Sequence, residues 1–270
     1  MESFSLKDKV VIVTGGTGVL GDAFVKGIVN AGGIAGILGR NEKVANERAD
    51  AINASGGKAI ALVADVLNEA HLIAARDKVM NTFGRIDGLV NGAGGNMPGG
   101  VIQPDQDLFT MNMDGMRQVM ELNLWGTLIP TQVFGKVMAD GGKGSIINIS
   151  SMAAQQAVTK VLGYSMAKAA IDNYTKWFAV EAANRYGDRI RMNAIAPGFF
   201  LTEQNRTLLT QPDGSYTERG SLVMGNTPFK RFGKPEELVG ALIWLLSDAS
   251  AFVSGTVVYV DGGFSVFSGV

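Results

Sequence analysis

The sequence contains no cysteine, and its only histidine is His71. The lack of cysteine excludes disulfide bonds, thiolate metal ligands and cysteine nucleophiles. A zinc-dependent dehydrogenase site is excluded as well, because it needs a set of Cys and His ligands. His71 lies in a segment of helical pattern, away from the motifs described below. We therefore predict a surface histidine, no histidine catalysis and no metal site.

Long apolar runs and an excess of one charge are also missing. No stretch of about eighteen uninterrupted apolar residues is present to span a bilayer, and the early charges at Lys7, Asp8 and Lys9 do not suit a signal peptide. The 24 basic and 25 acidic residues give a formal net charge of -1, which provides no general attraction for nucleic acid or anionic membranes. We expect a cytoplasmic protein whose partner is a small molecule, with neither nucleic acid nor membrane.

Short apolar runs alternate with longer segments of helical period along the 270 residues. Runs that are apolar on both faces are typical of strands in a parallel sheet, and helices supply the crossovers between such strands. The pattern predicts one α/β domain over 1–270, a Rossmann-type doubly wound parallel sheet of seven strands with helices on both faces. The predicted strands are Val10–Val13, Ile34–Leu38, Ala59–Val63, Ile86–Val90, Ser145–Ile149, Arg191–Ile195 and Val257–Val260, and the predicted helices are Val19–Ala31, Glu42–Ser55, Glu69–Phe83, Met113–Met138, Tyr164–Tyr186 and Pro235–Leu246.

Two stretches, at about 94–112 and 199–233, interrupt this alternation. The second contains a turn signal, Gln211-Pro212-Asp213-Gly214. Both stretches directly follow predicted strands, and ligands of open α/β sheets bind at the carboxyl ends of the strands. Long loops in such domains are usually functional, so we predict two substrate loops.

A glycine-rich turn follows the first predicted strand and opens the first predicted helix. Glycines let the backbone approach a pyrophosphate closely, and the helix start offers unpaired N–H groups. The turn predicts a set of dinucleotide-binding residues: Gly15, Thr17, Gly18, Val19, Leu20 and Gly21.

The end of the second predicted strand carries Arg40 where an acidic residue would bind the ribose of NAD. An arginine favours the 2′-phosphate of NADP(H); NAD(H) stays open, because Arg40 is also interpretable as a solvated residue at a helix start. Asp65, followed by Val66, is a candidate for the adenine amino group or for a cap of the helix that begins near Asn68. The backbone approaches the cofactor ribose again at the end of the fourth strand, at Asn91, Gly92 and Ala93.

Tyr164 and Lys168 are four residues apart and therefore share one face of a helix. A free tyrosine has a pKa of about 10, and a nearby cation lowers it. Such a tyrosine exchanges a proton with a hydroxyl or carbonyl group while a nicotinamide exchanges the hydride. Ser150 and Ser151 stand at the carboxyl end of the fifth predicted strand, and Asn123 lies in a helix after the fourth, so a doubly wound sheet brings all of them to one pocket.

Together these motifs resemble the short-chain dehydrogenase/reductase family over essentially the whole chain. The matching pieces are Thr14–Gly21, Asp65-Val66, Asn91–Gly94, Asn123, Ser151, Tyr164-x-x-x-Lys168 and Pro197-Gly198. The resemblance implies an NAD(P)-dependent oxidoreductase that interconverts a ketone and a secondary alcohol.

The resemblance also implies a role for each matching position. Tyr164 would be the general acid/base, Lys168 would bind the nicotinamide ribose and lower the tyrosine pKa, and Ser151 would bind the reacting oxygen. Asn123 would hold a water in a proton relay, and the residues against the nicotinamide would be Pro197, Gly198 and Thr202.

Two departures from the family pattern stand out. Gly92 replaces the second of two consecutive asparagines, which puts a side-chain contact with the cofactor ribose in doubt. The segment from Asn91 to Asn123 is longer than the family norm, which suggests an enlarged substrate loop.

The enlarged loop, Asn96 and the C-terminal stretch 260–270 resemble one branch of the family, the D-mannonate oxidoreductases or fructuronate reductases. This resemblance implies D-fructuronate and D-mannonate as substrate and product. Lys160 and Arg206 are candidates for the carboxylate, and the candidates for hydroxyl groups are Asn96, Gln155, Gln156 and Asn205.

Three alternatives stay open. They are a gluconate 5-dehydrogenase-like enzyme acting on 5-ketogluconate, a 3-oxoacyl carrier-protein reductase, and a nucleotide-binding regulator without turnover. The intact Ser151, Tyr164 and Lys168 disfavour the regulator. In the family, helices such as Met113–Met138 and Tyr164–Tyr186 form a dimer interface and an apolar C-terminal tail joins a tetramer contact, so the resemblance implies a homotetramer.

Overall fold

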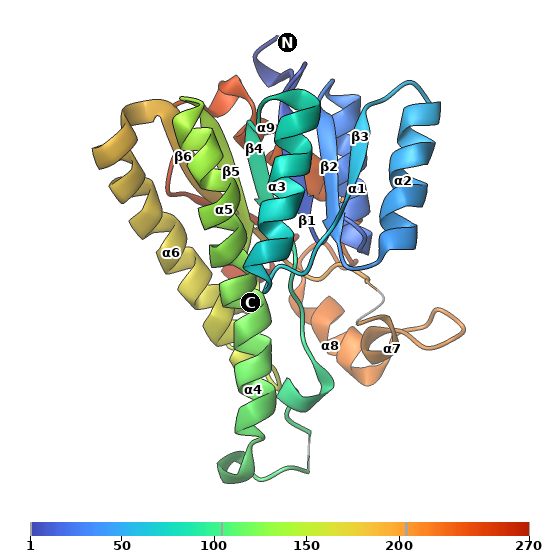
Figure 1. Cartoon of the computed structure of the whole chain (residues 1–270). Helices are drawn as coiled ribbons and strands as arrows, with labels where there is room; N and C mark the ends of the chain where they lie inside the picture. Colours follow the sequence, from blue (N-terminus) through green and yellow to red (C-terminus); the bar gives the residue numbers. More distant parts are fainter. Residues whose placement is uncertain (1, 104, 203–204, 270) are drawn as a thin grey trace.

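Seven parallel strands form one sheet in the order β3-β2-β1-β4-β5-β6-β7 (Figure 1). The computed structural model describes residues 2–103, 105–202 and 205–269. The predicted fold class is confirmed. The strands are β1 Val10–Thr14, β2 Ile34–Gly39, β3 Ala59–Val63, β4 Gly88–Asn91, β5 Gly144–Ile149, β6 Ile190–Pro197 and β7 Val257–Val260.

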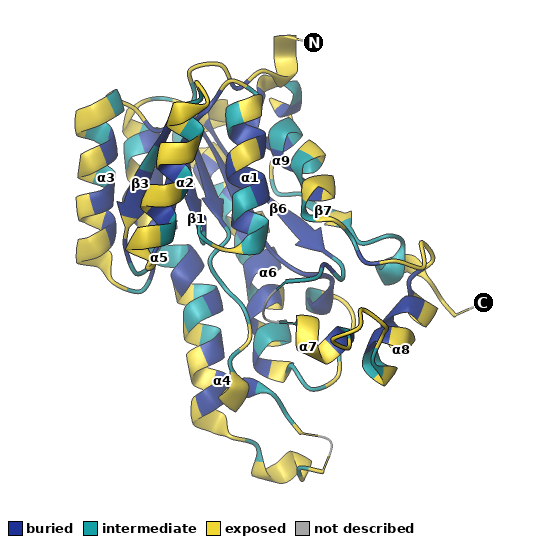
Figure 2. Cartoon of the chain, turned by 90° about the vertical axis from the view of Figure 1, so that its right-hand side faces the viewer, coloured by how far each residue is buried: buried dark blue, intermediate teal, exposed yellow. Residues whose placement is uncertain are grey.

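Helices cover both faces of the sheet (Figures 1 and 2). One face carries α1 Val19–Asn30, α2 Glu42–Ala54 and α9 Val239–Leu246, and the other carries α3 Glu69–Phe83, α5 Gly126–Asp140 and α6 Leu162–Tyr186. All the strands except β3 and β7 are buried along their whole length, as expected for a parallel sheet covered on both sides.

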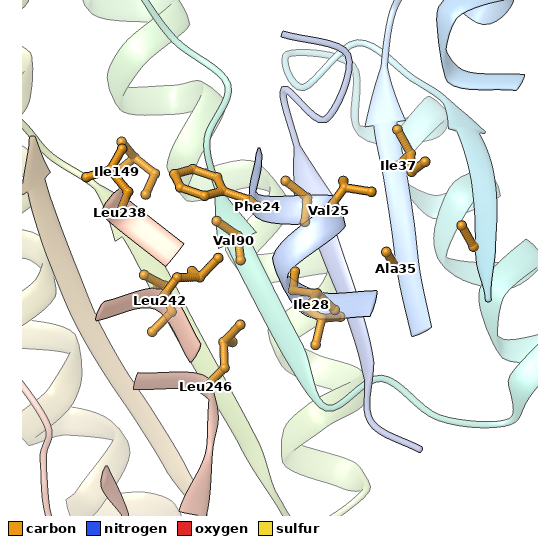
Figure 3. Packing of buried hydrophobic residues seen from close by; sticks show 14 of the residues in the cluster. Phe24, Val25, Ile28, Ala35, Ile37, Val90, Ile149, Leu238, Leu242 and Leu246 are labelled. Carbon is orange, nitrogen blue, oxygen red and sulfur yellow. The ribbon is translucent and has the colours of Figure 1, made fainter. Parts of the chain in front are cut away.

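Each face has its own apolar core. On the first face, Phe24 and Ile28 of α1 pack with Leu242 and Leu246 of α9 over Val90 of β4 (Figure 3). The second core contains residues of α3 and α5, among them Leu72, Val79, Phe134 and Met138. Each side chain of this size contributes about 1.5–3 kcal/mol when it is fully buried, so the two cores fix the sheet that carries the site.

The predicted helix Met113–Met138 is continuous in extent but not α-helical throughout. It consists of α4 Met113–Met120, a π-helical turn Glu121–Trp125 and α5. Asn123, at the centre of the turn, donates through Nδ2 to the Val119 carbonyl at 2.7 Å, and Thr127 donates to the Asn123 carbonyl. Side-chain groups thus donate hydrogen bonds to main-chain carbonyls in the region where the helix is wound more loosely. A π turn contains one residue more than the corresponding α-helical turn, and the hydrophobic periodicity of the sequence does not reveal this extra residue.

Two further helix starts differ from the prediction by small amounts. α6 begins two residues earlier than predicted, at Leu162. The predicted helix Pro235–Leu246 begins with a 3-10 turn, Pro235–Leu238, before α9.

The two predicted loops lie at the carboxyl end of the sheet (Figure 1). In the stretch 94–112, the described residues (94–103 and 105–112) form two short 3-10 turns, Pro98–Gly100 and Leu108–Thr110. The stretch 199–233 contains two helices that were not predicted, α7 Arg206–Leu209 and α8 Glu218–Asn226. A small apolar cluster holds this second stretch together, formed by Leu209, Val223, Met224 and Phe232.

The turn signal in the second stretch is confirmed. Thr210 and Tyr216 pair as an antiparallel bridge around it, and Gly214 has a φ of 86°, a conformation that glycine adopts without strain. Across the described residues, every helix is too short or too polar to cross a lipid bilayer.

Candidate active site

The glycine-rich turn brings two stretches of backbone into close contact. A Cβ atom at Gly21 would lie 2.1 Å from the Gly15 carbonyl oxygen, and one at Gly15 would lie 2.8 Å from the Gly92 carbonyl oxygen. Gly15 also has a φ of 68°. α1 begins at Val19, and the residue before it, Gly18, provides no side chain to cap the helix. The N–H groups of its first turn are therefore open to an anion.

β4 ends beside this turn. β1 and β4 are neighbours in the sheet, and the strand order reverses between them. Thr14 Oγ1 accepts hydrogen bonds from the Gly92 and Ala93 N–H groups, both at 3.1 Å. A Cβ atom at Gly92 would lie 2.8 Å from the Thr14 carbonyl oxygen. The asparagine side chain that the family has at this position would therefore not fit here without a backbone shift.

The Asn91 side chain points into the protein. It is fully buried, and Nδ2 donates to Thr131 Oγ1 and Asn148 Oδ1, both at 2.9 Å. The cofactor contact predicted for Asn91 can therefore come only from its backbone.

The predicted adenosine-binding residues lie along the ends of β2 and β3. Arg40 is exposed directly after β2. Asn68 caps α3 by accepting from the His71 N–H, so the cap is not Asp65, whose carboxylate accepts from the Leu67 N–H at 3.0 Å. The Val66 side chain is buried and supports this edge.

One arginine at the glycine-rich turn was missed from the sequence. Arg48 of α2 donates through Nη1 to the Gly16 carbonyl at 2.7 Å and to the Gly18 carbonyl at 3.0 Å, and it also pairs with Asp22. Only the packing of α2 beside the turn reveals this contact, because Arg48 lies far from the turn in sequence.

Tyr164 and Lys168 lie near the start of α6, with the Lys168 ammonium 5.4 Å from the centre of the Tyr164 ring. Lys168 is buried, and Nζ donates to the Ile149 carbonyl at the end of β5, at 2.7 Å. Ser151 follows β5, and its side chain accepts from the Ala153 N–H at 3.2 Å. α6 and the end of β5 thus bring the tyrosine, the lysine and the serine together.

Burial shifts both titrating groups of this pair. It raises the pKa of Tyr164, and a hydrogen bond with the Ser151 side chain acts in the opposite direction. Burial lowers the pKa of Lys168 to about 8, while the negative charge of Asp172 opposes that shift. The charge state of the lysine is therefore sensitive to its neighbours near neutral pH.

Asn123 joins the first loop to the site. Its Oδ1 accepts from the Gly95 N–H at 3.0 Å, and Nδ2 donates to the Gly95 carbonyl at 2.8 Å. A Cβ atom at Gly94 would lie 2.6 Å from Asn123 Oδ1 and 3.5 Å from Lys168 Nζ. Asn123, Gly94 and Lys168 therefore meet at one point, and the π turn sets the position of Asn123.

Comparisons with known proteins agree with this arrangement. A family model described as enoyl-(acyl carrier protein) reductase matches residues 18–265. The uncharacterized oxidoreductase UxuB of Bacillus subtilis is 42% identical over 275 residues, 98% of each chain. The chain belongs to the short-chain dehydrogenase/reductase family. It is an NAD(P)-dependent oxidoreductase that acts on CH–OH groups.

Two solved structures of short-chain dehydrogenase/reductases have closely similar folds. One is a candidate D-mannonate oxidoreductase from Haemophilus influenza with bound NAD, 42% identical, with a TM-score of 0.89 over 98% of each chain. The other is a gluconate 5-dehydrogenase from Burkholderia cenocepacia in complex with NADP and tartrate, 34% identical, with a TM-score of 0.85 over 97% of each chain.

In this short-chain dehydrogenase/reductase, the end of β6 lies against the residues after β7. The Gly198 N–H donates to the Val260 carbonyl at 3.0 Å, and a Cβ atom at Gly198 would lie 2.6 Å from the Asp261 Cα. Pro197 is buried and Thr202 is half-buried. The Thr202 N–H donates to Asn205 Oδ1, and Asn205 Nδ2 donates to the Phe200 carbonyl, both at 2.8 Å. Asn205 therefore shapes this loop.

The predicted substrate residues separate into two groups. Gln155 Nε2 donates to Asp172 at 3.4 Å, and Gln156 Nε2 donates to the Ser265 carbonyl at 2.8 Å. Like Asn205, these two side chains already make hydrogen bonds within the chain, although Gln155 and Gln156 are exposed. Asn96 and Arg206 are exposed, and Lys160 is half-buried with a φ of 76°.

A second cation was missed from the sequence. Arg219 of α8 lines an open cavity of about 160 Å³ together with Thr159, Phe199, Leu222, Asn226 and Phe264. Its guanidinium donates to the Thr159 hydroxyl and carbonyl, both at 3.3 Å. Arg219 lies in a segment without helical periodicity in its sequence, so neither α8 nor the position of Arg219 was predicted.

The residues at the carboxyl edge of the sheet fit a nicotinamide dinucleotide. Gly15 and Gly21 leave no room for side chains where the backbone must approach a pyrophosphate, and α1 starts uncapped. The predicted ribose partner, Lys168, is buried beside the end of β5. The turn would hold the pyrophosphate, and Tyr164 and Lys168 would face the nicotinamide end.

We expect Gly21→Ala to weaken NADPH binding by at least about tenfold, which corresponds to ~1.4 kcal/mol. The added methyl group would collide with the Gly15 carbonyl, 2.1 Å away, and displace the turn. Isothermal titration of NADPH measures the effect. Gly240→Ala is the matched control, because nothing lies within 4 Å of a Cβ atom there. Equal affinity of Gly21→Ala and the wild-type protein would contradict the assignment of the turn.

Proposed function

We propose that the protein is a cytoplasmic reductase that converts D-fructuronate to D-mannonate and the reverse, with NADP(H) as the preferred cofactor. The observation that carries the proposal is the meeting of Tyr164, Lys168 and Ser151 at the end of β5. Arg219 lines a cavity together with Thr159, which belongs to the segment between Ser151 and Tyr164. The similarity to a candidate D-mannonate oxidoreductase supports the choice of a sugar acid.

In this proposal the Tyr164 hydroxyl donates a proton to the carbonyl oxygen during reduction and accepts it back during oxidation. The Ser151 hydroxyl holds the same oxygen by a hydrogen bond. A bound nicotinamide supplies or accepts the hydride at the reacting carbon. The Lys168 ammonium binds the nicotinamide ribose and stabilises the tyrosinate form of Tyr164.

Asn123 keeps the first loop against Lys168 in this proposal. It bonds both main-chain groups of Gly95, and Gly94 lies between its side chain and Lys168. The proton relay that the family resemblance implies would pass beside this point.

A sugar acid needs a cation for its carboxylate and polar groups for its hydroxyls. Lys160 is part of the segment that leads from Ser151 to Tyr164, and its carbonyl accepts from the Ile102 N–H of the first loop. Arg219 lies beside this segment and donates to the Thr159 hydroxyl. We propose that Arg219 binds the carboxylate, because a guanidinium matches a carboxylate with two parallel hydrogen bonds. Lys160, Arg206 and Asn96 are further candidates on the two loops at 94–112 and 199–233.

Two other substrate classes, 5-ketogluconate and a 3-oxoacyl thioester, are compatible with the same catalytic residues. The similarity to a gluconate 5-dehydrogenase complexed with tartrate favours a sugar acid over an acyl thioester. A 3-oxoacyl carrier-protein reductase would need a basic docking surface, and the balance of 24 basic and 25 acidic residues does not favour one.

Oxidation of NADPH and NADH with D-fructuronate, 5-ketogluconate and an acetoacetyl thioester tests the proposal. We expect efficient turnover of D-fructuronate and little of the other two. Tyr164→Phe should lower kcat by about 10²–10⁴-fold and leave NADPH affinity unchanged, and Tyr186→Phe at the far end of α6 is the control. Turnover of another ketone alone would reassign the substrate, and turnover unaffected by Tyr164→Phe would reject the catalytic assignment.

The preference for NADP(H) rests on Arg40, since similar structures hold NAD in one case and NADP in the other. Arg40→Ala should weaken NADPH binding about 10–100-fold, the value of one charge-assisted hydrogen-bond contact, and change NADH binding little. Arg76→Ala, a half-buried arginine of α3 that pairs with Asp77, is the control. Wild-type protein that binds NADH at least as tightly as NADPH would contradict the preference.

We propose a homotetramer. Trp177 and Val180 of α6 are 60% and 61% exposed, and Trp125 at the π turn is 49% exposed. Large apolar side chains exposed together on a helix suit a protein interface, and Phe252, before β7, is a further exposed aromatic residue. Light scattering at micromolar concentration should give the mass of four chains. A monomer under these conditions would contradict the assembly.

A further inference from the structure

We propose that Asp172 is a positioning residue of the active site, which holds the segment of Ser151 against α6 and places a carboxylate one helical turn from Lys168. The inference rests on the catalytic set proposed above. It does not depend on which ketone is the substrate.

Asp172 continues the line of functional side chains along α6. Tyr164, Lys168 and Asp172 follow one another at intervals of four residues, which places them on one face of a helix. The tyrosine and lysine of this face meet the end of β5. The carboxylate lies one turn further along the same face and meets the segment that follows β5.

Two side chains of that segment donate to the Asp172 carboxylate. The Ser150 hydroxyl donates to Oδ1, and Gln155 Nε2 donates to Oδ2 at 3.4 Å. Ser150 and Gln155 lie on either side of Ser151 and the 3-10 turn Met152–Ala154. One carboxylate therefore holds both ends of the segment that carries the predicted substrate-binding serine.

Asp172 is 3% exposed, and a buried carboxylate is costly unless it is paired and hydrogen-bonded. The charged groups that face it on α6 are Lys168 and Lys176, and both favour its ionised form. Tyr259 of β7 faces it from the sheet; burial raises the pKa of that tyrosine, and the charges of Asp172 and Asp261 act in the same direction. Burial raises the pKa of Asp172 itself, while the hydrogen bonds from Ser150 and Gln155 act in the opposite direction.

The same charge acts on Lys168. Burial lowers the pKa of this lysine to about 8, and Asp172 opposes the shift. Without the carboxylate the lysine would lose its proton at lower pH. Tyr164 needs the ammonium form beside it, so Asp172 influences catalysis through Lys168 and through the position of Ser151 without touching the substrate.

Two variants separate the two effects. Asp172→Asn removes the charge and keeps an oxygen acceptor for Ser150, whereas Asp172→Ala removes both. Glu181→Gln is the control, since it removes a carboxylate from the same helix where the partner is Arg185 on the surface. The readouts are kcat/KM for NADPH against pH, NADPH affinity against pH, and hydrogen exchange of residues 150–155.

We expect the fall of kcat/KM at alkaline pH to move to lower pH by roughly 0.5–1 unit in Asp172→Asn. The sign follows from the charge: a lysine that loses a nearby anion holds its proton less tightly. Hydrogen exchange at 150–155 should change less than in Asp172→Ala, because asparagine keeps an oxygen acceptor for Ser150 and loses only the one for Gln155. Asp172→Ala should also raise hydrogen exchange at 150–155 and lower kcat about tenfold or more. Glu181→Gln should match the wild-type protein in every readout.

An alkaline fall that stays in place or moves to higher pH in Asp172→Asn would overturn the proposal, and this variant decides alone if Asp172→Ala does not fold. NADPH affinity and hydrogen exchange require no turnover. They therefore still test Asp172 if D-fructuronate proves to be the wrong substrate, in which case the kinetic profile is measured with the ketone that the wild-type enzyme reduces.

Discussion

The hydrogen bond from the buried Lys168 ammonium to the Ile149 carbonyl is the contact on which the geometry of the site depends. It joins the start of α6 to the end of β5 at 2.7 Å, and a cation away from water is tolerated only with partners of this kind. The tyrosine one turn earlier and the serine two residues after Ile149 are placed by the same junction. Gly94 of the first loop lies beside the lysine: a Cβ atom at Gly94 would be 3.5 Å from Lys168 Nζ.

The sheet explains why this junction can form at all. Its strand order reverses between β1 and β4, and the backbones on the two sides meet at Gly15 and Gly92 without side chains between them. The reversal opens the carboxyl edge for a dinucleotide. Thr14, through its bonds to Gly92 and Ala93, holds the two sides together.

Much of this arrangement was predictable because its causes are local or periodic. Buried parallel strands have continuous apolar sequences, and two side chains four residues apart share a helix face, so the sheet and the Tyr164–Lys168 pair followed from the sequence. Hydrogen bonds between distant residues leave no such pattern. The burial of the Asn91 amide, the contact of Arg48 with the glycine-rich turn and the clasp of Asp172 on Ser150 therefore required the structure. Arg219 was missed because α8 packs on a small local cluster whose apolar residues have no regular spacing in the sequence, so the helix was not predicted.

The π turn at Glu121–Trp125 has a consequence for how this chain can vary. An α-helix turns by about 100° per residue, and a π turn contains one residue more than the α-helical path. α4 and the loop attached to it are therefore rotated about the helix axis relative to α5, by an amount set by the length of the chain and not by any one side chain. Loss or gain of a single residue in this turn would swing the whole first loop around the pocket while the sheet and its cores stayed in place. Such a change would also move Asn123, which lies at the centre of the turn and bonds Gly95, so the site itself constrains the length of the turn.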